Sequence, residues 1–116
     1  MPTMLAMTQS LGEFEQLVLL ATLRAGDLAY GTRILHEVRA AGVKRASRGA
    51  LYVTLARLEE KGLLRARPVE AGGERAGRPR RYLRVTGDGL RALRSSRATL
   101  LRLWNGLESL LGEAEG

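Results

Sequence analysis

The chain of 116 residues contains no cysteine, which excludes disulfide bonds, thiolate zinc sites and cysteine nucleophiles. Its one histidine, His36, lies within a predicted helix beside Glu37, where a solvated role fits better than catalysis. A phosphate-binding loop of the Gly-x4-Gly-Lys-Ser/Thr type is also missing. With so few groups able to carry chemistry, we expect a protein that is not an enzyme and that needs no metal and no cofactor.

Long hydrophobic runs are absent too, and no stretch of about eighteen apolar residues could span a membrane. Residues 1–7 lack the basic region of a secretory signal. The hydrophobic fraction of 45% and the charged fraction of 27% are ordinary for a globular protein. These features predict about one domain in the cytoplasm, without a membrane partner.

Positive charge is plentiful and is concentrated in one segment. The chain has a net charge of +7. Residues 65–84 contain seven arginines and only two glutamates, so most of the surplus lies there. Such a segment favours a polyanionic partner, although a solvated basic loop has the same composition.

Apolar spacing predicts two helices in the first 41 residues. The first runs from about Leu11 to Arg24, with Ser10-Leu-Gly-Glu13 as its capping box, and is apolar around most of its circumference. The second opens at Tyr30-Gly31, continues to about Ala41, and has a single buried stripe.

A third helix is predicted from the N-cap Ser47 to Gly62. At 100° per residue, Leu51, Leu55 and Leu58 share the face that must be buried. The opposite face is narrow and has small side chains, namely Gly49, Val53, Ala56 and Arg57. A helix with such a face can lie deep in the major groove of DNA.

Two strands are predicted next, at residues 63–69 and 80–85, joined by a loop rich in Gly and Arg. The order of three helices and two strands is that of a winged helix-turn-helix. The fold class is therefore α+β and mostly α, with a DNA-binding domain over residues 1–86.

The last predicted helix has Thr86 as its N-cap and continues to about Leu111, so that residues 87–116 form a C-terminal dimerisation helix. Its apolar stripe is too long for the small domain before it, which favours pairing with a second copy. The predicted dimer interface consists of Leu93, Leu100, Leu103, Trp104, Leu107 and Leu111. The alternative is that this helix folds back on the first helix of its own chain.

Four segments in this order and spacing resemble the PadR-type transcriptional regulators, in the short-tailed branch with one C-terminal helix. They are Leu11-Gly-Glu-Phe-Glu, Tyr30-Gly31, the stretch from Gly49 to Leu64, and Gly77-Arg-Pro-Arg-Arg-Tyr82. The resemblance implies a homodimeric winged-helix repressor, often responsive to a small aromatic or cationic compound. Leu83 stands where the family often has an aromatic residue, and Gly87 stands where a proline is common.

The DNA-binding residues are predicted from these patterns and from the resemblance together. Those on helices are Tyr30, Thr32, Ser47, Arg48, Gly49, Tyr52, Val53 and Arg57. Those on the wing are Arg75, Arg78, Arg80 and Arg81. Base edges, phosphates and a narrow minor groove are their expected contacts.

Trp104 is the one tryptophan, and two interpretations of it stay open. The resemblance implies a cavity between protomers, where a flat effector stacks on a tryptophan of this helix. The other interpretation is ordinary packing in a dimer interface. The main function predicted is thus a sequence-specific regulator of transcription, and the alternative is a winged-helix module for protein or RNA without operator specificity.

Overall fold

The computed structural model of the chain describes residues 11–67 and 81–115. Three helices come first: α2 (Glu13–Ala25), α3 (Gly31–Ala40) and α4 (Arg48–Glu60), with the 3-10 turn η1 (Gly26–Leu28) before α3. The strands β1 (Leu64–Ala66) and β2 (Leu83–Val85) follow, then α5 (Gly87–Trp104) and α6 (Glu108–Glu115). The described residues from Leu11 to Val85 are called the winged core below, and α5 with α6 is called the arm.

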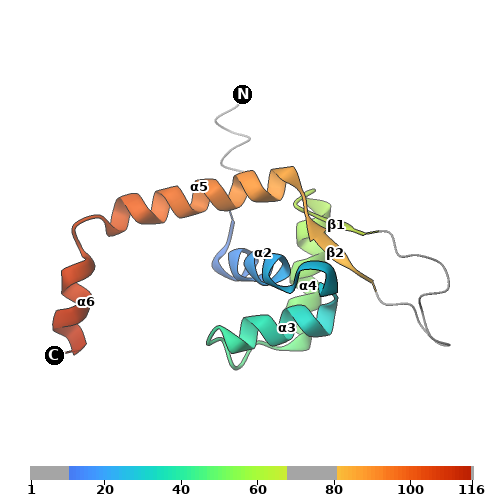
Figure 1. Ribbon diagram of the computed structural model, residues 1–116, viewed down its shortest axis with the longest axis horizontal. Coiled ribbons are helices and arrows are strands. Elements are labelled where there is room, and N and C mark those ends of the chain that lie inside the picture. Colours follow the sequence, from blue (N-terminus) through green and yellow to red (C-terminus); the bar gives the residue numbers. More distant parts are fainter. Residues whose placement is uncertain (1–10, 68–80, 116) are drawn as a thin grey trace.

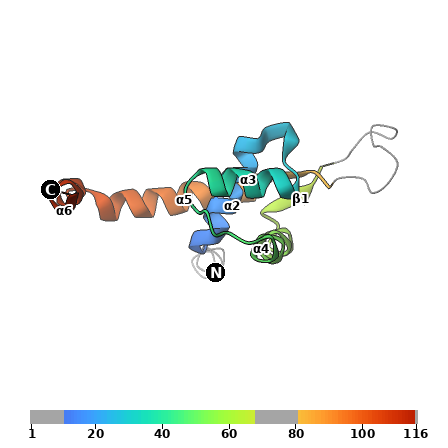
Figure 2. The same cartoon turned by 90° about the horizontal axis from the view of Figure 1, so that it is seen from below.

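The three helices of the winged core pack around one cluster of apolar side chains (Figure 1). Leu19, Ile34, Leu51 and Leu58 are fully buried in it. The predicted core face of α4 is confirmed, because Leu51, Leu55 and Leu58 are all buried and the opposite face is exposed. In Figure 2, α4 is viewed nearly along its axis at one edge of the molecule.

Helix α2 begins at Glu13, two residues later than the start predicted with Ser10 as the N-cap. Its N-cap is Gly12, and the carboxylate of Glu15, three residues on, accepts a hydrogen bond of 2.9 Å from the Gly12 N–H. The predicted pair Ser10–Glu13 is therefore wrong, since Glu13 is already the first helical residue. Gly26, with φ of +58°, ends the helix.

The predicted cap of α4 is confirmed: Ser47 Oγ accepts a hydrogen bond of 3.0 Å from the Ala50 N–H. The turn before this cap is held by Arg39, a residue to which the sequence assigned no role. Its Nε and Nη2 atoms both donate to the Ala46 carbonyl, at 3.0 and 2.8 Å. The last turn of α3 thereby fixes where α4 begins.

The two strands are antiparallel, with Leu64 opposite Val85 and Ala66 opposite Leu83. They are shorter than predicted, although the Arg67 N–H still donates to the Tyr82 carbonyl at 2.7 Å. Tyr30 forms a bridge with Tyr82 on the other side of β2, where the Leu83 N–H donates to the Ala29 carbonyl at 2.8 Å. Leu83, the departure from the resemblance, is buried and completes the core.

The predicted single C-terminal helix is wrong beyond Trp104, because Gly106 adopts a φ of +84° and separates α5 from α6. Helix α5 starts at the predicted N-cap, where Thr86 Oγ1 accepts from the Gly89 N–H at 3.1 Å and donates to the Gly62 carbonyl at 2.7 Å. Figure 1 shows α5 crossing above α2 and continuing past the winged core, with α6 bent downward at its far end. None of the described helices is long and apolar enough to cross a membrane.

Candidate nucleic-acid interface

Helix α4 presents an exposed surface of small side chains beside a hollow of about 450 Å³. Val53 on this surface is 57% exposed. Gly49 meets open space, because a Cβ added there would have no neighbour within 4 Å. Packing within the winged core therefore does not require a glycine at position 49. The missing side chain leaves room for an external partner to approach the backbone of α4.

The hollow is formed by the start of α3, the exposed side of α4 and the start of β2. Its lining is Tyr30, Gly31, Thr32, Tyr52, Leu55, Ala56, Glu59, Arg81 and Leu83. Four predicted DNA-binding residues meet there, although the sequence places them in three separate segments. They are Tyr30, Thr32, Tyr52 and Arg81.

Tyr52 lies against the first turn of α3, with its side chain 47% exposed. A Cβ at Gly31 would overlap the Tyr52 hydroxyl and lie only 2.7 Å from its Cζ. Gly31 is therefore needed for the close approach of this ring, a reason that the sequence did not reveal. The ring lies at the rim of the hollow and not in the core.

Tyr30 and Tyr82 form an edge-to-face pair, with ring centroids 5.6 Å apart and planes at 81°. Arg67 lies over the Tyr82 ring at 4.9 Å, and its Nη2 donates to the Asp27 carbonyl at 2.7 Å. The Tyr82 ring is thus engaged in packing beside β2. Arg67, one of the seven arginines of residues 65–84, therefore stabilises the contact between β1, Tyr82 and Asp27.

Arg81 forms an ion pair with Glu59 in the last turn of α4. Its Nη1 and Nη2 atoms donate to the two carboxylate oxygens at 2.7 and 2.6 Å. These hydrogen bonds raise the pKa of Arg81 above its ordinary value, although partial burial acts against them. The sequence predicted Arg81 to reach DNA and did not predict this partner.

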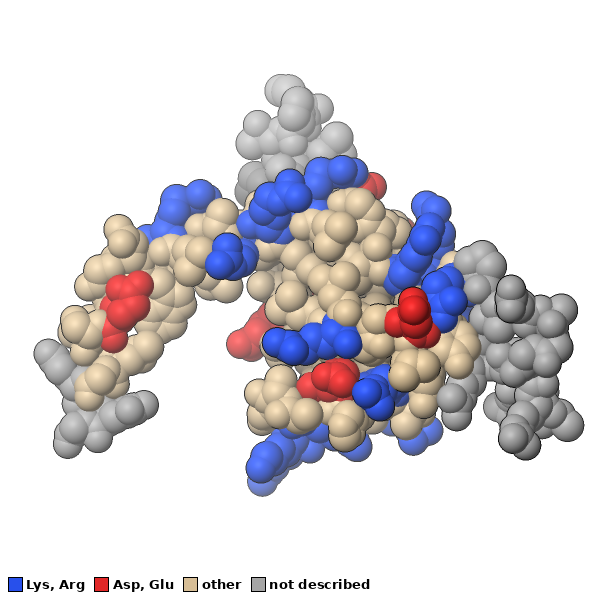
Figure 3. All heavy atoms as spheres, viewed as in Figure 1, with Lys and Arg blue, Asp and Glu red and all other residues tan. Residues whose placement is uncertain are grey.

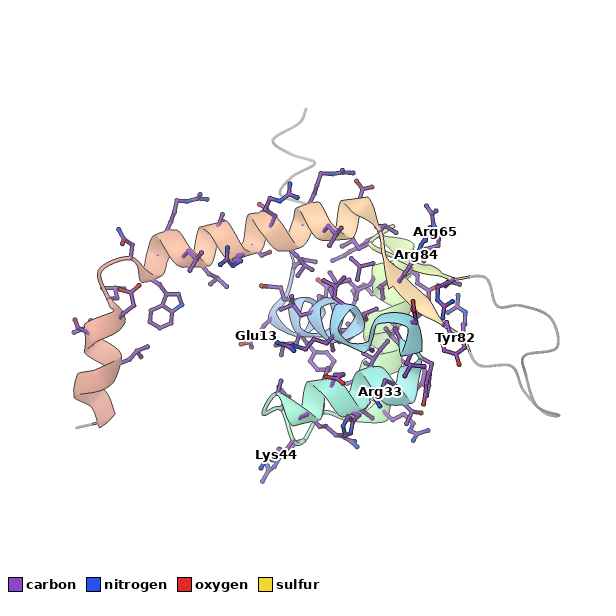
Figure 4. All side chains as sticks on the ribbon, viewed as in Figure 1. Glu13, Arg33, Lys44, Arg65, Tyr82 and Arg84 are labelled. Carbon is purple, nitrogen blue, oxygen red and sulfur yellow. The ribbon has the colours of Figure 1, made fainter. Side chains whose placement is uncertain are left out.

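Arg65 and Arg84 are direct cross-strand partners on the exposed face of the sheet (Figure 4). Neither has an ion pair with a described residue, so two like charges face each other at a cost to the sheet. The labelled view places them on the opposite side of the sheet from α3. They therefore lie away from the hollow.

Ser47, Arg48 and Arg57 complete the predicted helical set, and all three are exposed on α4 or at its N-cap. Thr54, on the same helix, is only 5% exposed and faces the core. The predicted wing residues Arg75, Arg78 and Arg80 lie outside the described residues. Figure 3 shows Lys and Arg spread over one face of the winged core, while the outer half of the arm is mostly tan, interrupted by a basic and an acidic patch.

The end of α4 is connected to α2 by a buried ion pair that the sequence did not reveal. Lys61 Nζ lies 2.8 and 3.0 Å from the carboxylate oxygens of Glu15, whose side chain is 8% exposed. Burial alone raises the pKa of Glu15, but Lys61, the Gly12 N–H and the charge of Arg57 together lower it below its ordinary value of 4.5. Forty-six positions separate the two residues, too far for any local pattern to pair them.

The arm exposes an unusual amount of apolar surface for a single chain. Leu103 is 69% exposed, and Leu100, Leu107 and Leu111 are each about half exposed. Leu93, by contrast, is half-buried and packs on the core of its own chain. The predicted interface residues are thus divided, with Leu93 at the core and Leu107 and Leu111 beyond the break at Gly106.

Trp104 is 40% exposed and lines an open groove of about 600 Å³ between α5 and α2. The wall from α2 includes Leu20 and Leu23, which are also about half exposed. Helix α5 therefore contacts α2 of its own chain, the alternative considered from the sequence, yet leaves both helices partly uncovered. Among residues 11–67 and 81–115, no group of three or more acidic, histidine or cysteine residues is placed to hold a metal ion.

Comparison with known families and structures agrees with this architecture. Residues 19–95 match the transcriptional regulator PadR-like family. No curated protein sequence matches the chain. The family match runs from the middle of α2 through the rest of the winged core to the first half of α5.

Solved structures of similar proteins cover most of the chain. A PadR family transcriptional regulator from Eggerthella lenta is 33% identical, with a TM-score of 0.57 over 79% of this chain and 80% of that one. A PadR-like transcription factor from Bacteroides fragilis is 28% identical, with a TM-score of 0.67 over 90% and 93%. A PadR-like regulator from Bacillus cereus, at 21% identity, has the same fold, with a TM-score of 0.66 over 84% and 90%.

Proposed function

Since the chain belongs to the PadR-like family of transcriptional regulators, we propose that it binds duplex DNA as a homodimer and represses transcription. The exposed surface of α4 enters the major groove, whose width admits one helix. The observation that carries this proposal is the convergence of Tyr30, Thr32, Tyr52 and Arg81 on one hollow beside that surface.

Each part of the interface has a distinct task. Val53 packs on a thymine methyl, and Arg48 and Arg57 donate to base edges or phosphates. The free amides at Ser47, Arg48 and Gly49 bind one phosphate at the start of α4. On the wing, Arg75, Arg78, Arg80 and Arg81 contact phosphates and the minor groove.

The homodimer is supported by the exposed leucines of the arm and by the open groove beside α2. A second copy covers these apolar surfaces, and its two-fold axis places two α4 helices on successive turns of DNA, about 34 Å apart. With about six phosphates neutralised per protomer, affinity falls by orders of magnitude between about 50 and 200 mM salt.

The proposal also includes an effector site beside Trp104. The groove is apolar and large enough for a small aromatic or cationic molecule. In the proposed dimer the second protomer approaches this groove. Titration of the dimer with planar cationic and phenolic compounds tests this site through Trp104 fluorescence. If none of them changes the emission, the effector site is withdrawn and Trp104 remains an interface residue.

A gel-shift comparison tests DNA recognition itself. The probes are the duplex upstream of the protein's own gene, a scrambled duplex of equal length, and an RNA hairpin. We expect the upstream duplex to bind at least about a thousandfold more tightly than the scrambled one, in line with specific regulators. Equal binding to all three would replace the regulator by a general polyanion-binding module, the second candidate function.

Repression is tested separately, with a reporter gene placed behind the bound duplex. We expect expression to fall when the protein is supplied. A rise in expression would keep the DNA-binding proposal and reverse the sign of regulation.

A further inference from the structure

The ion pair between Glu59 and Arg81 joins the last turn of α4 to the start of β2, at the edge of the proposed DNA interface. Its geometry is the two-pronged match of a guanidinium and a carboxylate, with donor–acceptor distances of 2.7 and 2.6 Å. Such pairs fix the orientation of the arginine as well as its place.

An acid at this position is unexpected for a helix that faces a polyanion. A carboxylate near DNA phosphates lowers affinity through simple repulsion. Glu60, the next residue, is exposed, and its side chain has no hydrogen bond or ion pair with any described residue. Glu59, in contrast, has a side chain only 22% exposed and is fully engaged with Arg81.

The ion pair with Glu59 engages only some of the hydrogen-bond donors of Arg81. A guanidinium has five N–H donors, and the pair with Glu59 needs two of them. The Arg81 side chain is 63% exposed, so its remaining donors are accessible to a second acceptor. One arginine can therefore hold a carboxylate and a phosphate oxygen together.

We propose that Glu59 is a positioning residue that holds Arg81 in the orientation in which it meets the DNA backbone. This inference rests on the proposed DNA-binding function and adds a residue to it. An unpaired arginine loses much side-chain freedom when it binds a phosphate, and an arginine already fixed by Glu59 loses less. The acid thus strengthens binding to a polyanion, contrary to the effect of its charge alone.

The decisive experiment compares Glu59→Ala with Glu60→Ala in the full-length chain, with affinity for the bound duplex measured at two or more salt concentrations. Both changes remove one negative charge from the same turn. We expect Glu59→Ala to weaken binding about fivefold because Arg81 is no longer pre-oriented. We expect Glu60→Ala to strengthen binding by up to about twofold because only repulsion is removed.

Arg81→Gln gives the second arm. If Arg81 contacts a phosphate, this change lowers the slope of log affinity against log salt by about 0.9. In the Arg81→Gln background, Glu59→Ala then strengthens binding, since no arginine remains for Glu59 to position. Far-UV circular dichroism and the Tm of each variant show whether the free protein keeps its fold.

Each outcome decides the proposal. Stronger binding by both Glu59→Ala and Glu60→Ala overturns it, as does an Arg81→Gln variant with unchanged affinity and salt slope. Failure of the unaltered protein to bind any duplex is a different result, because it removes the proposed function itself. Weaker binding by Glu59→Ala alone, reversed in the Arg81→Gln background, supports the positioning role.

Discussion

The winged core and the arm differ in how far their leucine side chains are buried. In the winged core, Leu19, Leu51 and Leu58 are buried by their own chain. In the arm, Leu100, Leu103 and Leu107 are about half exposed or more. Both regions are helical and rich in leucine, so composition does not separate them. The winged core therefore buries most of its large apolar side chains within one chain, whereas the arm leaves an apolar surface of the kind that marks an interaction site.

The largest expected effect comes from the interior of the winged core. Leu51→Ala removes a fully buried side chain from α4 and is expected to lower the free energy of unfolding by about 3 kcal/mol. Leu28→Ala, at a site 51% exposed, is the matched control and changes it by less than about 0.5 kcal/mol. Urea denaturation measures both, and equal effects would contradict the assigned core.

The ion pair that connects α2 to the end of α4 gives the next effect. Lys61→Met leaves the buried carboxylate of Glu15 without its main partner, and is expected to cost about 3 kcal/mol at neutral pH. Glu15→Gln is milder, because Lys61 is 27% exposed and can turn to solvent. Thermal denaturation at pH 7 ranks the two variants, and the opposite order would contradict the burial of Glu15.

The pH dependence of stability sharpens the same point. The folded-state pKa of Glu15 is lowered, so its contribution to stability is fully present above its unfolded pKa, near 4.5, and is lost as the pH falls through the folded value. Glu15→Gln is expected to flatten the fall in Tm below about pH 4.5. An equally steep fall in this variant would show that other carboxylates control acid unfolding.

The junction between the two regions gives an intermediate effect. A Cβ at Gly89 would overlap the Leu63 carbonyl and lie 2.6 Å from Val85 Cγ1, so α5 must shift to make room. We expect Gly89→Ala to cost about 2 kcal/mol, within the range of overpacked sites. Gly112→Ala is the control, since nothing lies within 4 Å of an added Cβ there. A Tm equal to that of this control would mean that α5 is loosely attached.

The smallest effect on folding is expected on the exposed side of α4. Gly49→Ala meets no neighbour and should raise the free energy of unfolding slightly, by up to about 0.5 kcal/mol. Gly49→Leu should also fold. It should weaken duplex binding at least tenfold, because the leucine side chain keeps the backbone of α4 from approaching the major groove of DNA. Normal binding by the leucine variant would place the DNA elsewhere.

Local chemistry explains why much of the winged core could be predicted. The N-caps Ser47 and Thr86, the buried face of α4 and the two strands all follow from spacing and from short-range hydrogen bonds. The family match confirms the winged-helix architecture that the resemblance implied.

What could not be predicted depends on contacts between distant segments. The pairs Glu15–Lys61 and Glu59–Arg81 have no local signature, and neither has the approach of Tyr52 to Gly31. The sequence predicted one helix through Gly106 because the leucine spacing continues through it, while a positive φ at this glycine interrupts the helix. Of the predicted DNA contacts, the structure brings four to one hollow, and their binding role remains a proposal.

Sedimentation of the full-length protein tests most directly the claim that the arm requires a second copy. At micromolar concentration we expect the mass of two chains. Leu103→Glu, on the most exposed leucine of the arm, is expected to sediment as one chain with an unchanged circular dichroism spectrum. A single-chain mass for the unaltered protein at high micromolar concentration would contradict the account.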